Sequence, residues 1–231
     1  MVGLLVLLAF SWLALYIFER KNLAALGFTQ PLERFKQFFV GFLFTALICS
    51  FSQFLESWLS SSNWVLNQSL EPLEFWAAIW WDIRSVLTEE LVFRGALLYL
   101  LIQWIGPRKS ILISGIAFGV YHWFSYGVFG NLWAMVFVFI GTGIMGLALA
   151  LGFSKTKSIV LPIGLHLGWN VFYNSVFSKG PLGDLLFISI LGNELNGMNS
   201  LINFLTGMIL VPSLVLFFVS YFPWKNEGFK S

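Results

Sequence analysis

The chain has 231 residues, of which 58% are hydrophobic and only 10% are charged. An average soluble domain is about a quarter charged, so this composition excludes a free soluble globule. The net charge of +2 is too small and too scattered for a nucleic-acid-binding surface. We therefore expect a membrane protein with no nucleic-acid partner, and the length allows about seven crossings.

The beginning of the chain is predicted to be a retained first span. Residues 1–18 have the length of a signal peptide, but no basic segment precedes them and no small-residue cleavage site stands before Glu19. The single cysteine, Cys49, lies in an apolar run. This excludes an intrachain disulfide and a cysteine-based metal cluster, and we interpret Cys49 as a small buried hydrophobic residue.

Long apolar runs without strand-like alternation predict helices rather than a barrel. At about 20 residues per crossing, the pattern predicts an all-α, polytopic membrane helix bundle with about seven transmembrane helices. The expected spans are 2–18, 38–54, 83–105, 110–124, 132–153, 159–177 and 201–222. An apolar patch at 185–191 is interpreted as a re-entrant piece, which would give an eighth element.

Charge alternates between the expected loops. Basic residues follow the first, third and fifth spans, namely Arg20, Lys21, Arg34, Lys36, Arg108, Lys109, Lys155 and Lys157. With Lys225 and Lys230 in the tail, this pattern predicts an external N-terminus and a cytoplasmic C-terminus. The aromatic segment 75–81 suits an interfacial helix, and we interpret Asp82 and Arg84 as marking the external end of the third span.

Ionisable and amide side chains lie inside three of the expected spans. They are Glu89, Glu90 and Arg94 in the third span, His122 in the fourth, and His166 and Asn170 in the sixth. A charge at mid-membrane costs about 2.5 to 3.5 kcal/mol on insertion scales, so such residues are functional candidates by default. A single Glu–Arg pair or a single histidine in a membrane helix often has only a structural role. Packing alone does not explain all six of these polar residues in three apolar helices.

Helical spacing predicts which way these side chains face. Glu90 and Arg94 are four residues apart, so they can pair. Glu89 lies about 100° around the helix from Glu90 and is left to face something else, which suits it to proton transfer. His166 and Asn170 share one face and can hold a ligand or an oxyanion.

Two further features accompany the polar residues. Phe118 stands one helical turn before His122 and provides an aromatic wall behind the imidazole. Glycines in the fourth, fifth and sixth spans would let the helices approach until their polar faces meet. These glycines are Gly115, Gly119, Gly141, Gly143, Gly146, Gly164 and Gly168.

Taken in order, the motifs resemble those of the CPBP family of intramembrane proteases, the CAAX-protease and bacteriocin-processing family that includes Rce1-like proteins. The family pattern EExxxR, FxxxH and HxxxN/D is filled by Glu89, Glu90 and Arg94, by Phe118 and His122, and by His166 and Asn170. Any one motif is weak, but the ordered set is specific. The resemblance covers a catalytic core at about 76–177, preceded by spans and an interfacial connection in 1–75 and followed by a loop and last span in 178–231.

The resemblance implies hydrolysis of peptide bonds within the bilayer. The type activity removes the last three residues of a prenylated C-terminal Cys-a-a-X protein, and bacterial relatives process other peptides. The implied partners are a peptide or protein substrate, prenylated or membrane-embedded, and membrane lipid. The small chain is expected in a bacterial plasma membrane.

The resemblance also implies a role for each motif residue. Glu89 is implied to be the general base that activates water, and His122 to hold or polarise that water. Glu90 and Arg94 are implied to support this geometry, while the His-x-x-x-Asn pair of the sixth span stabilises the oxyanion. Phe118, with Trp123 and Trp169, which adjoin motif positions, is a candidate for lining the substrate cleft.

The metal and the function class stay open at this point. His122, His166 and Glu89 could hold one zinc ion, but HExxH is absent and the family has been described both as metalloproteases and as glutamate-type proteases, so metal-independent catalysis is favoured. A proton-coupled carrier would also use buried carboxylates and histidines, although inverted repeats are missing. A non-enzymatic immunity or scaffold protein is the remaining alternative.

Overall fold

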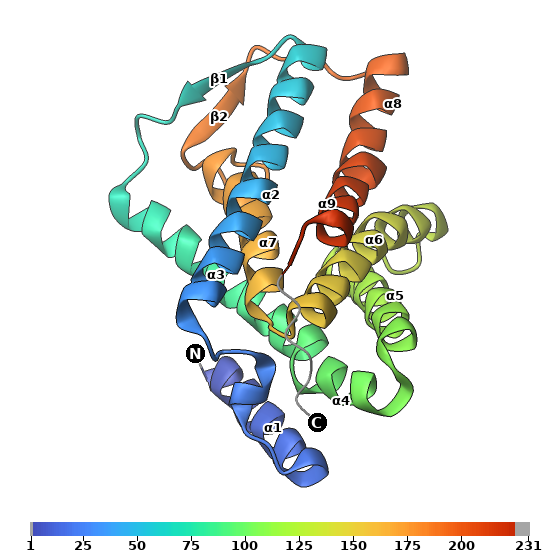
Figure 1. The fold of residues 1–231 in the computed structure, drawn as a ribbon. Helices are drawn as coiled ribbons and strands as arrows, with labels where there is room; N and C mark the ends of the chain where they lie inside the picture. The colour runs from blue at the N-terminus through green and yellow to red at the C-terminus, as the bar shows by residue number, and fades with distance from the viewer. Residues whose placement is uncertain (1, 225–231) are drawn as a thin grey trace.

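The computed structural model describes residues 2–224, so Lys225 and Lys230 lie outside the described residues. Its helices are α1 (Val2–Glu19), α2 (Pro31–Ser60), α3 (Pro72–Arg94), α4 (Ala96–Ile105), α5 (Pro107–Ser125), α6 (Leu132–Thr156), α7 (Val160–Asn170), α8 (Gly197–Leu205) and α9 (Val211–Tyr221). Shorter turns are the 3₁₀ turn η1 (Leu23–Leu26) and the π-helical η2 (Val171–Val176) and η3 (Thr206–Leu210). Figure 1 confirms the predicted all-α bundle.

Four helical stretches are long and apolar enough to cross a membrane. They are Val2–Glu19, Pro31–Ser60, Leu132–Thr156 and Gly197–Tyr221, the last of which joins α8, η3 and α9. They correspond to the first, second, fifth and seventh expected spans. The other three expected spans correspond to α3 with α4, to α5, and to α7 with η2, and these elements carry the polar motif residues.

The prediction of one continuous third span at 83–105 was wrong. The chain instead forms α3, which begins at Pro72 and includes the aromatic segment 75–81, and then turns at Gly95 into α4. A Cβ at Gly95 would collide with the carbonyl oxygen of Leu91, so this turn requires glycine. Pro72 lacks the N–H that a first helical turn leaves unbonded, which suits it to the start of α3.

The interpretation of 185–191 as a re-entrant piece was also wrong. Within it, β2 (Phe187–Ile190) pairs antiparallel with β1 (Asn63–Leu66), with Asn63 opposite Ile190. Two segments that are each too short to be stable alone thus satisfy each other's backbone groups at one end of the bundle. In Figure 1 the pair lies beside the C-terminal end of α2.

Glycines bring the helices of the bundle into backbone contact, as the sequence predicted. A Cβ at Gly164 would collide with the carbonyl oxygen of Phe38, and a Cβ at Gly168 with that of Phe42, so α7 lies directly against α2. On α6, a Cβ at Gly146 would lie 2.9 Å from the Cβ of Phe118 on α5. These contacts set how closely the helices that carry the motifs can approach.

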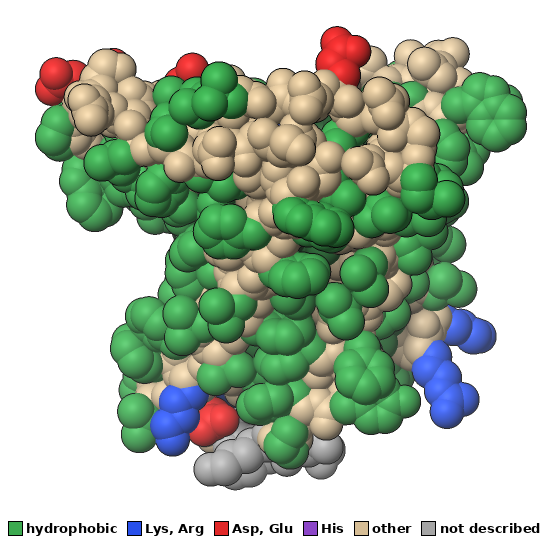
Figure 2. Space-filling model, turned by 90° about the horizontal axis from the view of Figure 1, so that it is seen from above, with side chains coloured by type: hydrophobic (Ala, Val, Ile, Leu, Met, Phe, Trp, Pro, Cys, Tyr) green, Lys and Arg blue, Asp and Glu red, His purple; other side chains and the backbone are tan. Residues whose placement is uncertain are grey.

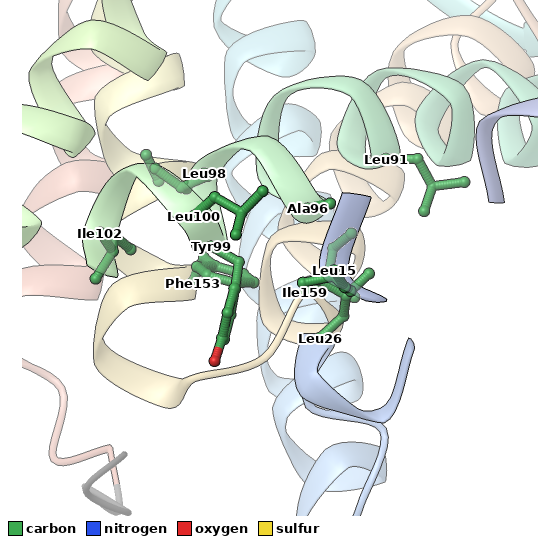
Figure 3. Packing of buried hydrophobic residues seen from close by; sticks show 11 residues of the cluster. Leu15, Leu26, Leu91, Ala96, Leu98, Tyr99, Leu100, Ile102, Phe153 and Ile159 are labelled. Atoms are coloured by element: carbon green, nitrogen blue, oxygen red, sulfur yellow. The ribbon is translucent and has the colours of Figure 1, made fainter. Parts of the chain in front are cut away.

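A buried apolar cluster joins α1 to the rest of the bundle. Figure 3 shows its side chains, which come from α1, η1, α3, α4, α6 and Ile159, the residue before α7. Its fully buried members include Leu15, Leu98, Phe153 and Ile159. Cys49 on α2 is fully buried elsewhere in the bundle, as predicted.

The surface has the charge distribution of a membrane-spanning protein. On the face that Figure 2 shows, acidic side chains lie along the upper edge, and Lys and Arg lie towards the lower edge, one of them beside an acidic side chain. Hydrophobic side chains dominate between these edges. An apolar band between two polar ends is what a bilayer requires.

Replacement of Gly164 by Ala is expected to lower the stability of the bundle. The added Cβ meets the backbone of Phe38, which has no flexible end that can move away. We expect a cost of about 1–3 kcal/mol, measured as a lower melting temperature of the protein in detergent. Gly207→Ala, where nothing lies within 4 Å of the added Cβ, is the control, and equal melting temperatures for the two variants would contradict the close approach.

Candidate active site

Three helices bring the polar motif residues together. Glu89, Glu90 and Arg94 lie in the last two turns of α3, His122 lies in the last turn of α5, and His166 lies in the middle of α7. The carboxylates and imidazoles of these helices lie within 4 Å of one another. The cluster therefore depends on how α3, α5 and α7 pack.

Glu90 is the buried centre of an ion-pair network. Its Oε1 lies 3.2 Å from Nη1 of Arg94 and 2.8 Å from Nδ1 of His166, and the side chains of Glu90 and Arg94 are fully buried. Nη2 of Arg94 donates to the carbonyl oxygen of Gly146 at 3.4 Å, and the guanidinium lies 4.2 Å from the ring centroid of Phe118. Buried charges need such partners, because an unpaired charge in this setting costs several kcal/mol.

Glu89 faces away from Arg94 and towards the two histidines. Its Oε2 lies 3.9 Å from Nε2 of His122 and 3.9 Å from Nε2 of His166. This oxygen is buried and has no hydrogen-bond partner among the described residues. A distance of 3.9 Å is too long for a direct hydrogen bond, but it fits one water that contacts both atoms at about 2.8 Å.

The second ring nitrogen of each histidine fixes how the imidazole presents its Nε2. Nδ1 of His122 lies 2.8 Å from the carbonyl oxygen of Phe118, which can only accept, so Nδ1 carries a proton. Nδ1 of His166 donates in the same way to the carboxylate of Glu90. Both imidazoles therefore turn Nε2 towards Glu89, and these second bonds hold the rings in that orientation.

The remaining predicted site residues lie around this cluster. Phe118 is buried between the rings of His122, at 4.4 Å, and His166, at 6.0 Å. Asn170 follows His166 by one turn of α7, and none of the hydrogen bonds found within residues 2–224 uses its side chain. The indole N–H of Trp123 donates to the backbone of α6, and Trp169 stacks on a tyrosine of η2 at 5.7 Å. A role in a substrate cleft stays a prediction for these aromatic residues.

The possible zinc ligands do not fit a zinc ion as they stand. Tetrahedral zinc with bonds of about 2.0–2.1 Å holds its ligand atoms about 3.3 Å apart, whereas Glu89 is 3.9 Å from each histidine nitrogen. In the part of the chain that the structure describes, no group of three His, Cys, Asp or Glu side chains is arranged to hold a metal. No chemical step is therefore assigned to a metal here.

Asp82 is a buried residue rather than the interface marker predicted from the sequence. Its side chain is fully buried and accepts hydrogen bonds from Nδ2 of Asn174 at 2.6 Å and from Oγ of Ser175 at 2.7 Å. Asp82 precedes Glu89 by two helical turns, so it lies on the same face of α3. The sequence contained a signal for this inward orientation, because Asp82 lies seven residues, or two helical turns, before the motif residue Glu89.

The π-helix η2 brings Asn174 and Ser175 to Asp82. In a regular α-helix, the residue that shares the face of His166 two turns later is Tyr173. The wider turn of η2 turns Asn174 and Ser175 towards α3 instead. Two buried carboxylates of α3 therefore hold the segment formed by α7 and η2. Glu90 contacts His166 of α7, and Asp82 contacts Asn174 and Ser175 of η2.

The comparisons with known proteins agree with this geometry. Residues 71–172 match the model of a family described as type II CAAX prenyl endopeptidase Rce1-like. The resemblance indicated by the motifs is thus confirmed for a segment that contains all of them. No curated protein and no solved structure matches the chain. The family match and the long apolar helices together support an integral membrane protein with protease activity.

Replacement of Asp82 by Ala is expected to destabilise the protein by about 2–4 kcal/mol. The substitution leaves the buried donors of Asn174 and Ser175 without their acceptor. Thermal unfolding in detergent measures the change. Asp184→Ala is the control, since Asp184 lies exposed in a loop and such changes usually stay within about 0.5 kcal/mol. Equal melting temperatures would show that Asp82 does not hold η2.

Proposed function

We propose that this chain, whose segment 71–172 matches the model of the Rce1-like CAAX endopeptidase family, is an intramembrane endopeptidase that hydrolyses peptide bonds with water activated by Glu89. The observation that carries the proposal is the position of Oε2 of Glu89. This buried oxygen has no partner among the described residues and lies at equal distances from two imidazole nitrogens. That arrangement leaves one place for a reacting water.

In the proposed reaction His166 acts with a proton on both ring nitrogens, and Glu90 accepts one of them. Glu89 and Glu90 carry two negative charges, and Arg94 carries one positive charge. A protonated His166 brings the sum to zero, and uncompensated charge is costly in an apolar bundle. Its Nδ1 already donates to Glu90 at 2.8 Å, so Glu90 is the counter-ion of this imidazolium.

This protonation pattern satisfies a water in the cluster. The water donates one hydrogen bond to Oε2 of Glu89 and one to Nε2 of neutral His122, and it accepts one from Nε2 of His166. If both histidines were neutral, the water would face three acceptors, namely Oε2 of Glu89 and Nε2 of each histidine. It has only two protons to donate. One lone pair of the water oxygen stays free to attack a carbonyl carbon.

The reaction then follows general base catalysis. The water oxygen attacks the scissile carbonyl carbon while Glu89 takes one of its protons. The tetrahedral intermediate collapses when Glu89 returns that proton to the nitrogen of the leaving amine. Glu89 thus ends the cycle as a carboxylate. The products are a carboxylic acid and an amine, and the acid passes its proton to the amine, so that they leave as a carboxylate and an ammonium.

Donors for the oxyanion come from α7. Nε2–H of His166 can pass from the water to the developing oxyanion, and Asn170 presents an amide on the same helical face one turn later. Donors aimed at this charge in a site that excludes water contribute about 3–4 kcal/mol each. The role of Asn170 is supported by its freedom from other hydrogen bonds among residues 2–224.

The substrate is proposed to be a lipidated or membrane-associated peptide or protein. The rings of Tyr121 and Tyr126 flank His122, with centroids 5.2 and 5.1 Å away, and both residues are exposed. The cluster therefore approaches the surface of the bundle on this side, where exposed aromatic rings can contact an apolar substrate chain. A prenyl group is the lipid that the family match suggests.

Replacement of Glu89 by Gln is expected to lower kcat by about 10²- to 10⁴-fold, because the amide cannot accept the proton of the water. The measurement is cleavage of quenched fluorescent peptides, with or without a farnesylated cysteine followed by three residues, by purified protein in detergent. Glu74→Gln, an exposed residue of the same helix, is the matched control. Equal turnover by wild type and Glu89→Gln would rule out the proposed base, and substrate-dependent proton flux in proteoliposomes would favour a carrier.

Activity is expected to survive removal of metal ions, since the proposed reaction needs none. After dialysis against a strong chelator, elemental mass spectrometry should find less than one zinc ion per chain. The dialysed protein should cleave the peptide at an unchanged rate. One zinc per chain, with activity lost on its removal and restored on its return, would contradict metal-independent catalysis.

A further inference from the structure

The turn of α7 that carries Asn170 lies between two hydrogen-bonded contacts with α3. On one side His166 donates to Glu90, and on the other side Asn174 donates to Asp82. The two acceptors are eight residues apart on α3, and the two donors are also eight residues apart on the segment formed by α7 and η2. The two segments run in opposite directions, so Asn170 stands midway between the contacts.

The side chain of Asn170 has no bond of its own that fixes its amide. It is half-buried and takes part in none of the hydrogen bonds found within residues 2–224. At the matching position of α3, midway between the two carboxylates, stands Val86, which packs in a buried apolar cluster with Leu167 and Val171. A valine cannot hydrogen-bond an amide, so the place of this amide depends on how the backbone of its turn is held.

The contact at Asp82 forms because the helix widens directly after Asn170. Asn174 and Ser175 follow Asn170 by four and five residues, which is one turn of a π-helix, whose hydrogen bonds join residues five apart. Asp82 accepts from both side chains, at 2.6 and 2.7 Å. A π-turn is rare and is found frequently at functional sites, and here its two inward side chains have their acceptor on the helix that carries the proposed base.

Asn174 is enclosed by the chain that follows η2. A Cβ at Gly180 would collide with Oδ1 of Asn174, so this close approach requires glycine. The backbone N–H of Lys179 donates to the carbonyl oxygen of Tyr173 at 2.9 Å. The bond from Nδ2 of Asn174 to Asp82 therefore connects a well-anchored part of η2 to α3.

We propose that Asp82 is a positioning residue for the oxyanion donor Asn170. By holding η2 against α3, it sets the turn that aims the amide of Asn170 at the developing charge, although its own carboxylate is occupied with Asn174 and Ser175. A misplacement of about 1 Å in a reacting site can cost about 10²-fold in rate. This inference rests on the proposed peptidase function and adds to it a residue that acts on the rate through another side chain.

The test is a double-mutant cycle on cleavage of the quenched fluorescent peptide. Values of kcat and KM are measured for wild type, Asp82→Ala, Asp82→Asn, Asn170→Ala and the double variant Asp82→Ala with Asn170→Ala. Each value is taken per folded chain, at a temperature at which every variant is folded. The control is Leu15→Ala, which opens a cavity in the buried cluster beside α1 and lowers stability without a contact to η2.

Asp82→Ala is expected to lower kcat about ten- to a hundredfold and to leave KM within about twofold, because the interaction that is lost acts in the transition state. Asp82→Asn should keep most of the wild-type kcat, since its amide oxygen can accept from Asn174 and its amide nitrogen can donate to the hydroxyl of Ser175. Leu15→Ala should keep kcat within about twofold.

The double variant separates positioning from a general loosening of the bundle. If Asp82 acts through Asn170, its loss should change kcat by less than about twofold once Asn170 is alanine. The same fold-loss in both backgrounds, or an unchanged kcat in Asp82→Ala, overturns the inference. If Asp82→Ala does not fold, Ser175→Ala removes one of the two bonds and should lower kcat about three- to tenfold only while Asn170 is present.

The same measurements distinguish this inference from the proposed function. An unchanged kcat in Asn170→Ala would remove the oxyanion role of Asn170 and overturn the role of Asp82 with it. No cleavage by wild type would overturn the proposed peptidase function itself.

Discussion

The site depends on one buried carboxylate, that of Glu90. A single oxygen of this side chain accepts from Arg94 on its own helix and from His166 on α7. Without it, a fully buried guanidinium would lose its counter-ion, and His166 would lose the acceptor that fixes its ring. Because Arg94 is occupied with Glu90, the neighbouring Glu89 keeps one buried oxygen without a hydrogen-bond partner among the described residues. Adjacent carboxylates thus serve different purposes because they point to different sides of one helix.

Much of this arrangement could be predicted, because helical spacing is a local property. The pairing of Glu90 with Arg94, the separate direction of Glu89 and the close approach at Gly164 and Gly168 all follow from positions one to four residues apart. The family match covers residues 71–172, a segment that contains all of these motifs. The sequence does not determine which residue of another helix each motif residue contacts. The number of possible partners is small, because each of these apolar helices has only one polar face.

The features that were missed depend on distant partners. From the sequence, Asp82 was predicted to be an interface residue. Asn174, whose side chain donates a hydrogen bond to the buried Asp82 carboxylate, lies 92 residues away along the chain. The π-turn that aims Asn174 at Asp82 shifts the helical face within a few residues, and spacing rules for a regular helix do not anticipate it. The prediction for segment 185–191 failed for the same reason, since its strand partner lies before the whole segment 71–172 that matches the family.

That strand pairing has a consequence for how the protein assembles. β1 ends before α3 begins, and β2 starts after η2, so the two strands enclose every helix that carries a motif residue. Contacts between such distant segments form late in folding, because the entropy of closing the loop must first be offset by the packing inside it. The small sheet is therefore expected to form only after the helices between its strands have packed, and protection of residues 63–66 from proteolysis during refolding would report that step.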